Sequence, residues 1–125
     1  MVTDLNILCG WIAILCGILM GAGLGLFFHR DTWLGGYGSW PRRMIRLGHI
    51  AFFGIGLLNL AYAVTVKYLA WSHPPEICSL LLAGACALMP GMCFLAASDR
   101  RWRHGFAAPV ACVLFGVLGV LLGRI

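Results

Sequence analysis

The stretch of residues 5–28 reads LNILCGWIAILCGILMGAGLGLFF and contains no charged side chain. At about 1.5 Å per residue, a helix of this length reaches roughly 36 Å, which exceeds the hydrocarbon core of a bilayer, about 30 Å. Asp4 precedes the stretch and no basic residue does, whereas a cleaved signal peptide has a positive start and a shorter apolar run. The sequence therefore predicts a membrane-spanning helix that is retained in the mature protein.

Three further apolar segments follow, and the whole chain is 62% hydrophobic and 10% charged. Soluble domains have about a quarter charged residues, so the composition favours a membrane protein. Ser39 predicts the start of the second helix as its N-cap, and Pro41 suits its first turn. Pro74 and Pro75 predict its end, because proline cannot continue a helix. We predict one all-α domain, residues 1–125, with four transmembrane helices at about 5–28, 44–71, 77–98 and 105–123.

The basic residues gather in two connections. Of the nine, seven lie within residues 29–46 and 99–104. Because the positive-inside rule places arginine-rich loops in the cytoplasm, we predict an inner-membrane protein with cytoplasmic basic loops and both termini outside. The basic residues form no patch on a polar helix, so nucleic acid is not an expected partner. Anionic membrane lipid is an expected partner of these arginines.

Two segments carry small residues at helical spacing. Gly17, Gly21 and Gly25 are four residues apart in the first segment, and Gly119 and Gly123 repeat this spacing in the fourth. Small residues four apart let two helix backbones approach closely in lipid, where apolar burial gives little drive. We predict that these faces make helix–helix contacts, either within the chain or between copies.

The second segment carries a polar stripe. His49, Gly56, Asn59 and Lys67 fall within an arc of roughly 80° on a helix of 3.6 residues per turn. A polar stripe on a membrane helix points into a bundle or toward a partner protein. Asn59 is predicted near mid-membrane, where it needs a hydrogen-bond partner. We interpret it as an interhelical contact in preference to a ligand or ion site.

Histidines suggest a cofactor hypothesis. A membrane haem b needs two axial imidazoles at similar depth, and His49 with His29, or with His49 of a second copy, would meet that need. The nearby arginines would pair with the haem propionates. The plainer interpretation makes His29 and His104 interfacial loop residues and His49 a hydrogen-bonding residue of the bundle.

Cysteines suggest a second metal hypothesis. Cys9 and Cys16 are seven residues apart in the first segment, and Cys86 and Cys93 are seven apart in the third. Sulfur ligands suit Cu(I), but two turns separate each pair by about 10.5 Å, so ligands would have to come from different helices. The alternative is that these thiols are small apolar fillers of the helices.

No carboxylate lies inside an apolar segment and no nucleophile–base arrangement stands out, so enzyme activity is not supported. The leading hypothesis is a small subunit or scaffold of a larger inner-membrane assembly, such as redox machinery, that binds other membrane subunits or itself. A haem b electron carrier using His49 is the second hypothesis. The third is a small transporter or channel lined by Asn59 and by a kink at Pro90, where proline frees the carbonyl of Cys86.

Overall fold

A computed structural model describes residues 2–69 and 76–123, and this part of the chain is all-α, without a strand. Its long helices are α1 (Val2–Gly25), α2 (Trp40–Tyr68), α3 (Glu76–Ser98) and α4 (Ala107–Leu122), and its short 3₁₀ helices are η1 (Trp33–Gly35) and η2 (Arg100–Phe106). Four helical segments, the last including η2, are long and apolar enough to cross a bilayer. The prediction of an all-α protein with four transmembrane helices is confirmed.

The helix ends follow the local signals of the sequence. The side-chain oxygen of Ser39 accepts a hydrogen bond from the backbone nitrogen of Arg42 at 3.4 Å, so α2 begins at Trp40, before the predicted residue 44. Helix α1 ends at Gly25, because the nitrogens of Leu26 and Phe27 bond three residues back and tighten the chain into turns. Helix α2 ends at Tyr68, with Leu69 as its C-cap, three residues before the predicted residue 71; Pro74 and Pro75, to which the prediction attributed the end, lie outside the described residues.

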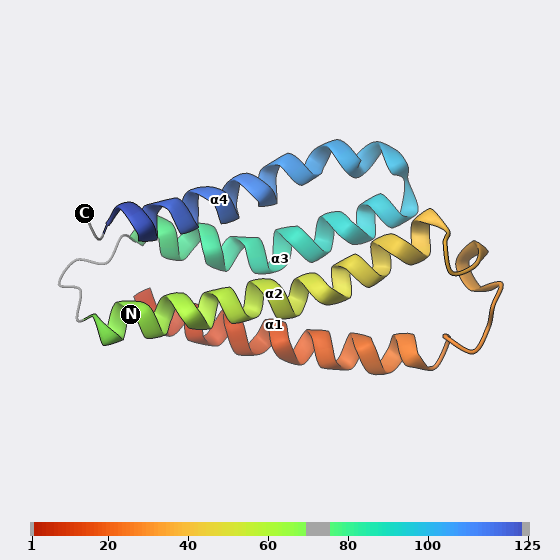
Figure 1. Cartoon of the computed structure of the whole chain (residues 1–125), viewed down its shortest axis with the longest axis horizontal. Coiled ribbons are helices and arrows are strands. Elements are labelled where there is room, and N and C mark those ends of the chain that lie inside the picture. Colours follow the sequence, from red (N-terminus) through yellow and green to blue (C-terminus); the bar gives the residue numbers. More distant parts are fainter. Residues whose placement is uncertain (1, 70–75, 124–125) are drawn as a thin grey trace.

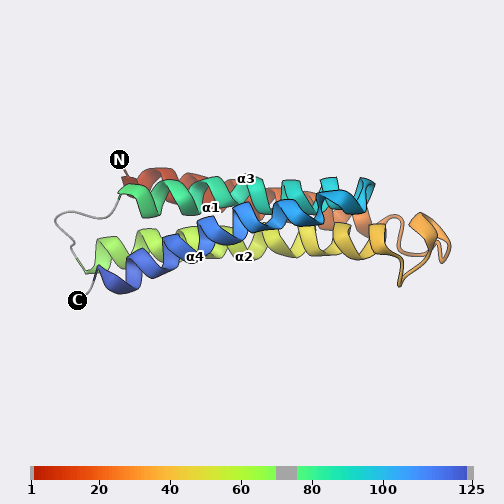
Figure 2. The same ribbon diagram turned by 90° about the horizontal axis from the view of Figure 1, so that it is seen from above.

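The four helices run alternately up and down, as Figure 1 shows. Helix α1 packs against α2 and α3, α2 packs against α3, and α4 packs mainly against α3. Seen from above, α4 crosses obliquely from α3 toward α2 (Figure 2). Both arginine-rich connections lie at one end of the bundle, which we call the basic end, and the first residue of α1 lies at the other, the terminal end.

The hydrophobic core lies toward the terminal end. Tyr62 and Val66 of α2 pack there against Cys78 and Leu82 of α3, and the side chains of Leu58, Val117 and Val120 close over them. Elsewhere the outer faces are large apolar side chains such as Leu19, which is 64% exposed. Lipid is the solvent in which such a surface is stable.

Pro90 lies inside α3 and its ring is fully buried. The helix continues through it from Glu76 to Ser98 without interruption. Because proline has no N–H, the carbonyl of Cys86 loses its usual helical partner there. The buried ring of Pro90 occupies space in the interior of the bundle. The next residue, Gly91, has no atom within 4 Å of the position that a Cβ would take.

Candidate functional site

Three polar side chains meet between α1, α2 and α3, and we call them the polar network. They are Asn6 in the second turn of α1, Asn59 of α2 and Ser79 in the first turn of α3. Asn6 and Asn59 are 0% exposed and Ser79 is 1% exposed. Because Asn6 and Ser79 lie near the starts of their helices, the network sits in the terminal half of the bundle, not at its midpoint.

The residues of the polar network hydrogen-bond to one another. Nδ2 of Asn6 donates to Oδ1 of Asn59 at 2.6 Å and to the carbonyl oxygen of Ser79 at 3.2 Å. The Ser79 hydroxyl donates to Oδ1 of Asn6. A buried polar group without a partner costs several kcal/mol in lipid, roughly, so this closure stabilises the three-helix contact.

Asn59 also ties α2 to α3. Its Nδ2 lies within hydrogen-bond distance of three acceptors: the carbonyl oxygens of Ile55, at 3.0 Å, and Leu82, at 2.8 Å, and Sγ of Cys86, at 3.2 Å. The side-chain amide of Asn59 therefore makes its hydrogen bonds to partners inside the protein. Asn59 was predicted from the sequence to need a partner, and Asn6 and Ser79 were not singled out. The sequence feature that could have identified Asn6 and Ser79 is that both are polar residues inside otherwise apolar segments.

Three glycines of α1, Gly10, Gly17 and Gly21, lie against α2. A Cβ built at Gly17 would lie 2.8 Å from the Phe53 ring, and one at Gly10 would lie 2.9 Å from the carbonyl oxygen of Gly56. Gly25, in contrast, has nothing within 4 Å. At Gly10 and Gly56 a Cβ on either residue would meet the carbonyl oxygen of the other, at 2.9 and 3.0 Å, and sequence reasoning had not singled out Gly10.

In α4, the glycines face α3 at two positions. A Cβ at Gly116 would meet the Leu82 side chain at 2.9 Å, and one at Gly119 would collide with the thiol of Cys78. Gly123 is exposed just beyond the end of α4. Small residues thus bring the terminal half of α4 close to α3.

The geometry around His49 bears on the haem hypothesis. A Cβ built at Gly21 would lie 2.6 Å from Nε2 of His49, and the imidazole lies edge-on to Phe53 with ring centroids 5.4 Å apart. An axial imidazole needs space around its ligating nitrogen for the macrocycle. Nε2 is packed against α1 instead, so this environment does not fit a haem on that nitrogen. His29 and His104 are exposed in the connections at the basic end.

The six cysteines are free thiols. Three of them, Cys9, Cys16 and Cys86, line a common groove of about 270 Å³ between α1 and α3. Within residues 2–69 and 76–123, no three His, Cys, Asp or Glu side chains are placed to hold a metal ion.

Arg42 is only 3% exposed although it carries a charge. Its guanidinium carbon lies 5.4 Å from the ring centroid of Phe28 and 5.6 Å from those of Trp33 and Tyr37. Its terminal nitrogens donate to the carbonyl oxygens of Phe28, at 3.4 Å, and Arg30, at 3.5 Å, while Nε has no partner among the described residues. The connection between α1 and α2 thus folds around one arginine.

Two glycines let that connection turn back over the guanidinium. Gly35 and Gly36 have φ angles of 83° and 93°, a region that glycine enters without steric cost. The nitrogen of Gly35 donates to the carbonyl oxygen of Thr32 at 3.0 Å, which closes the turn. Aromatic faces and backbone carbonyls therefore take the place of a counter-ion at Arg42.

Replacing Arg42 by alanine is expected to loosen residues 26–39 and to lower the free energy of unfolding by about 1–2 kcal/mol, the range of desolvated cation–π contacts. Hydrogen–deuterium exchange should rise most at the amides of Gly35 and Gly36. Arg43→Ala, at an exposed position one residue away, is the control and should leave exchange unchanged. Lysine at position 42 should not rescue the connection, because it lacks the planar fork. Unchanged exchange in Arg42→Ala would contradict this role.

The fold and this interior define a small polytopic membrane protein whose buried polar groups join its own helices. Comparison of the chain with protein-family models, with curated proteins and with solved structures finds no match.

Proposed function

We propose that this chain is a small integral subunit or scaffold of a larger inner-membrane assembly and that it acts through helix packing. The observation that carries the proposal is the groove between α1 and α3. Six of its eight lining residues are alanine or cysteine, and the other two are Ile12 of α1 and Phe52 of α2. The polar network supports the same conclusion, because its side chains bond to one another and are not directed into the groove.

The groove has the composition of a helix-docking surface. Cys9, Ala13 and Cys16 line its α1 side, and Ala83 and Ala87 line its α3 side. Ala83 and Ala87 are four residues apart, as are Cys9 and Ala13. Small residues at this spacing allow close backbone approach, on which helix association in lipid depends. We therefore assign the groove to a transmembrane helix of a partner subunit.

Bulky residues in this groove should release the partner. In Ala83→Leu and Ala87→Leu, proteins that co-purify with the chain from its own membranes should fall at least fivefold, as quantified by mass spectrometry. Ala61→Leu makes the same change on an exposed face of α2 and should retain them. Thermal melting of each purified variant checks that the bundle itself is intact. Equal recovery of companions with all three variants would refute this docking surface.

The same purification separates the other hypotheses. Co-purifying proteins that carry redox cofactors would support the hypothesis that the assembly is redox machinery. A Soret band that vanishes in His49→Ala would favour a haem carrier instead. Substrate-dependent flux in liposomes that contain only this chain would favour a transporter and would overturn the scaffold proposal.

We further propose that the basic end faces the cytoplasm, on the strength of the positive-inside rule. A membrane-impermeant maleimide should label Arg43→Cys and Arg101→Cys from the same side and Lys67→Cys from the opposite side. All three positions are exposed. The parent chain is the control, because its own cysteines lie in the apolar spans, away from charged reagents. Labelling of Arg43→Cys and Arg101→Cys from opposite sides would refute the topology.

A further inference from the structure

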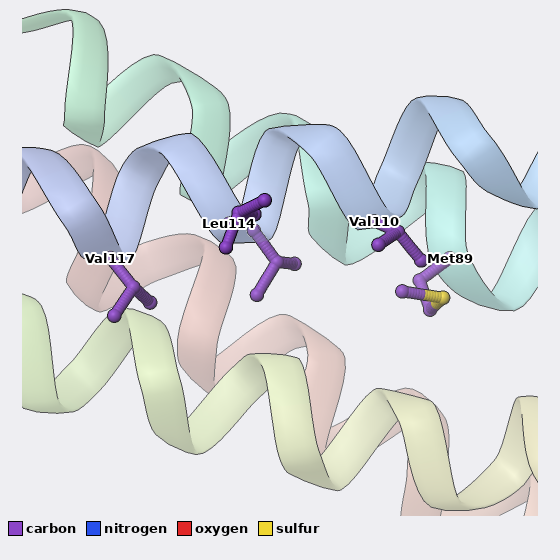
Figure 3. A pocket seen from close by; sticks show the side chains of 5 residues that line it. Met89, Val110, Leu114 and Val117 are labelled. Carbon is purple, nitrogen blue, oxygen red and sulfur yellow. The ribbon is translucent and has the colours of Figure 1, made fainter.

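A second groove lies beside α4. Its lining residues are Val110, Val113, Leu114 and Val117 of α4 together with Met89 of α3, and Figure 3 shows these side chains. Its volume is about 360 Å³, which is within the usual range for a ligand site, roughly 300–1,000 Å³. All of its lining side chains are apolar, so it suits a hydrocarbon occupant. We call it the α4 groove.

The α4 groove runs toward the basic end. Val117 and Val120 pack against the core formed by α2 and α3, so α4 is held closely at its terminal end. Figure 2 shows α4 crossing from above α2 at that end to above α3 at the basic end. Val110 lies in the first turn of α4, directly after η2. The groove therefore extends from the core to the first turn of α4, which directly follows η2 and its Arg100, Arg101 and Arg103.

The guanidinium of Arg100 and the indole of Trp40 lie close together at the basic end of the bundle. Nε1 of Trp40 donates to the carbonyl oxygen of Ala96 at 2.6 Å, and the guanidinium of Arg100 lies 5.4 Å from the centroid of the Trp40 ring. Trp40 and Leu58 are about five turns apart and so lie on one face of α2. Leu58 packs on the same core as Val117, so Trp40 lies on the face of α2 that meets this core.

The charge at this site is not balanced within the described residues. Arg100, Arg101 and Arg103 are exposed and form no salt bridge there. The nearest acid in the sequence, Asp99, uses its carboxylate as the N-cap of η2 and accepts a hydrogen bond from the backbone nitrogen of Arg101 at 2.9 Å. An anionic occupant at the basic end would supply the missing charge.

We propose that the α4 groove binds one anionic glycerophospholipid, with an acyl chain along Val110, Val113 and Val117 and the phosphate near Arg100. Tryptophan at the headgroup level, as at Trp40, is typical of a membrane interface. A partner helix is a poorer occupant. Close helix association in lipid depends on small side chains at the contact, and the α4 groove is lined only by valine, leucine and methionine.

The test uses the full chain in detergent and native mass spectrometry. Phosphatidylglycerol should be retained as one lipid per chain and at least fivefold more strongly than phosphatidylcholine with the same acyl chains. Arg100→Gln should weaken phosphatidylglycerol binding about fivefold, which corresponds to one basic residue near a membrane surface. Val113→Phe, which fills the groove, should weaken the binding of both lipids.

Two matched variants act as controls. Arg30→Gln removes another exposed arginine at the basic end, and Val64→Phe enlarges an exposed valine on α2; both should retain phosphatidylglycerol. Thermal melting of every variant shows whether the bundle is folded.

Three results would overturn the proposal. Equal retention of the two lipids would exclude a site for the anionic headgroup. Competition by glycerol phosphate at the concentration of the lipid would indicate a free-phosphate site without a role for the acyl chain. A dimer that Val113→Phe converts to a monomer would mean that a second copy fills the groove.

Discussion

Asn59→Leu is expected to lower the free energy of unfolding by about 2–3 kcal/mol. The variant loses the hydrogen bond that Asn59 accepts from Asn6 and the two that its Nδ2 donates among Ile55, Leu82 and Cys86, and such bonds average about 0.6 kcal/mol in membrane proteins. It also leaves the amide of Asn6 buried with only Ser79 as its partner, which adds a desolvation cost. Reversible unfolding in mixed micelles or steric trapping in bicelles measures the change.

The double variant Asn6→Leu with Asn59→Leu distinguishes a hydrogen-bond network from simple packing. Replacing both partners by apolar groups is often nearly neutral, so the double variant should cost less than the sum of the two single variants. The serines supply a matched control. Ser79→Ala should destabilise the fold, whereas Ser98→Ala should not, because Ser98 is exposed. Strictly additive costs at Asn6 and Asn59 would contradict the network.

The second large effect is expected at Gly10, where Gly10→Ala should cost about 1–3 kcal/mol, the range of overpacked interiors. Its Cβ would lie 2.7 Å from Cγ of Leu60 and 2.9 Å from the carbonyl oxygen of Gly56, so α1 and α2 would have to move apart. The movement should also disturb Asn6, one turn away, and lengthen its bond to Asn59. The same unfolding assay measures the cost.

Glycine-to-alanine changes at open positions are the controls for Gly10. Gly54 and Gly25 have nothing within 4 Å, so alanine there should be neutral or slightly stabilising, because alanine has the higher helix propensity. Gly25 is informative because it continues the spacing of Gly17 and Gly21. A similar small gain in stability at positions 10, 25 and 54 would show that helix propensity, and not helix contact, governs these sites.

Hydropathy was sufficient to predict the number and approximate extent of the membrane helices, because the length of an uncharged run directly reflects bilayer thickness. It did not identify the partners of Asn59. Which residues meet Asn59 depends on the rotation and relative depth of three helices, and a single sequence constrains neither. The same limit explains Gly10, whose importance comes from lying opposite Gly56.

Arg42 illustrates a different limit. In the sequence it is one of seven arginines near the predicted cytoplasmic interface, and composition gives no reason to separate it from Arg43. Its burial depends on where Phe28, Trp33 and Tyr37 are placed by a connection that has little regular structure. Such an environment emerges only once the tertiary fold of the connection is known.

Helix α4 packs mainly against one neighbour, α3, whereas α1, α2 and α3 each pack against at least two other helices. Hydrogen bonds of the polar network also connect α1, α2 and α3. Under a pulling force applied from the C-terminal side, α4 should therefore peel away first, as a separate low-force event. The remaining three helices should then be extracted together at a higher force. The protein would yield in two mechanical steps.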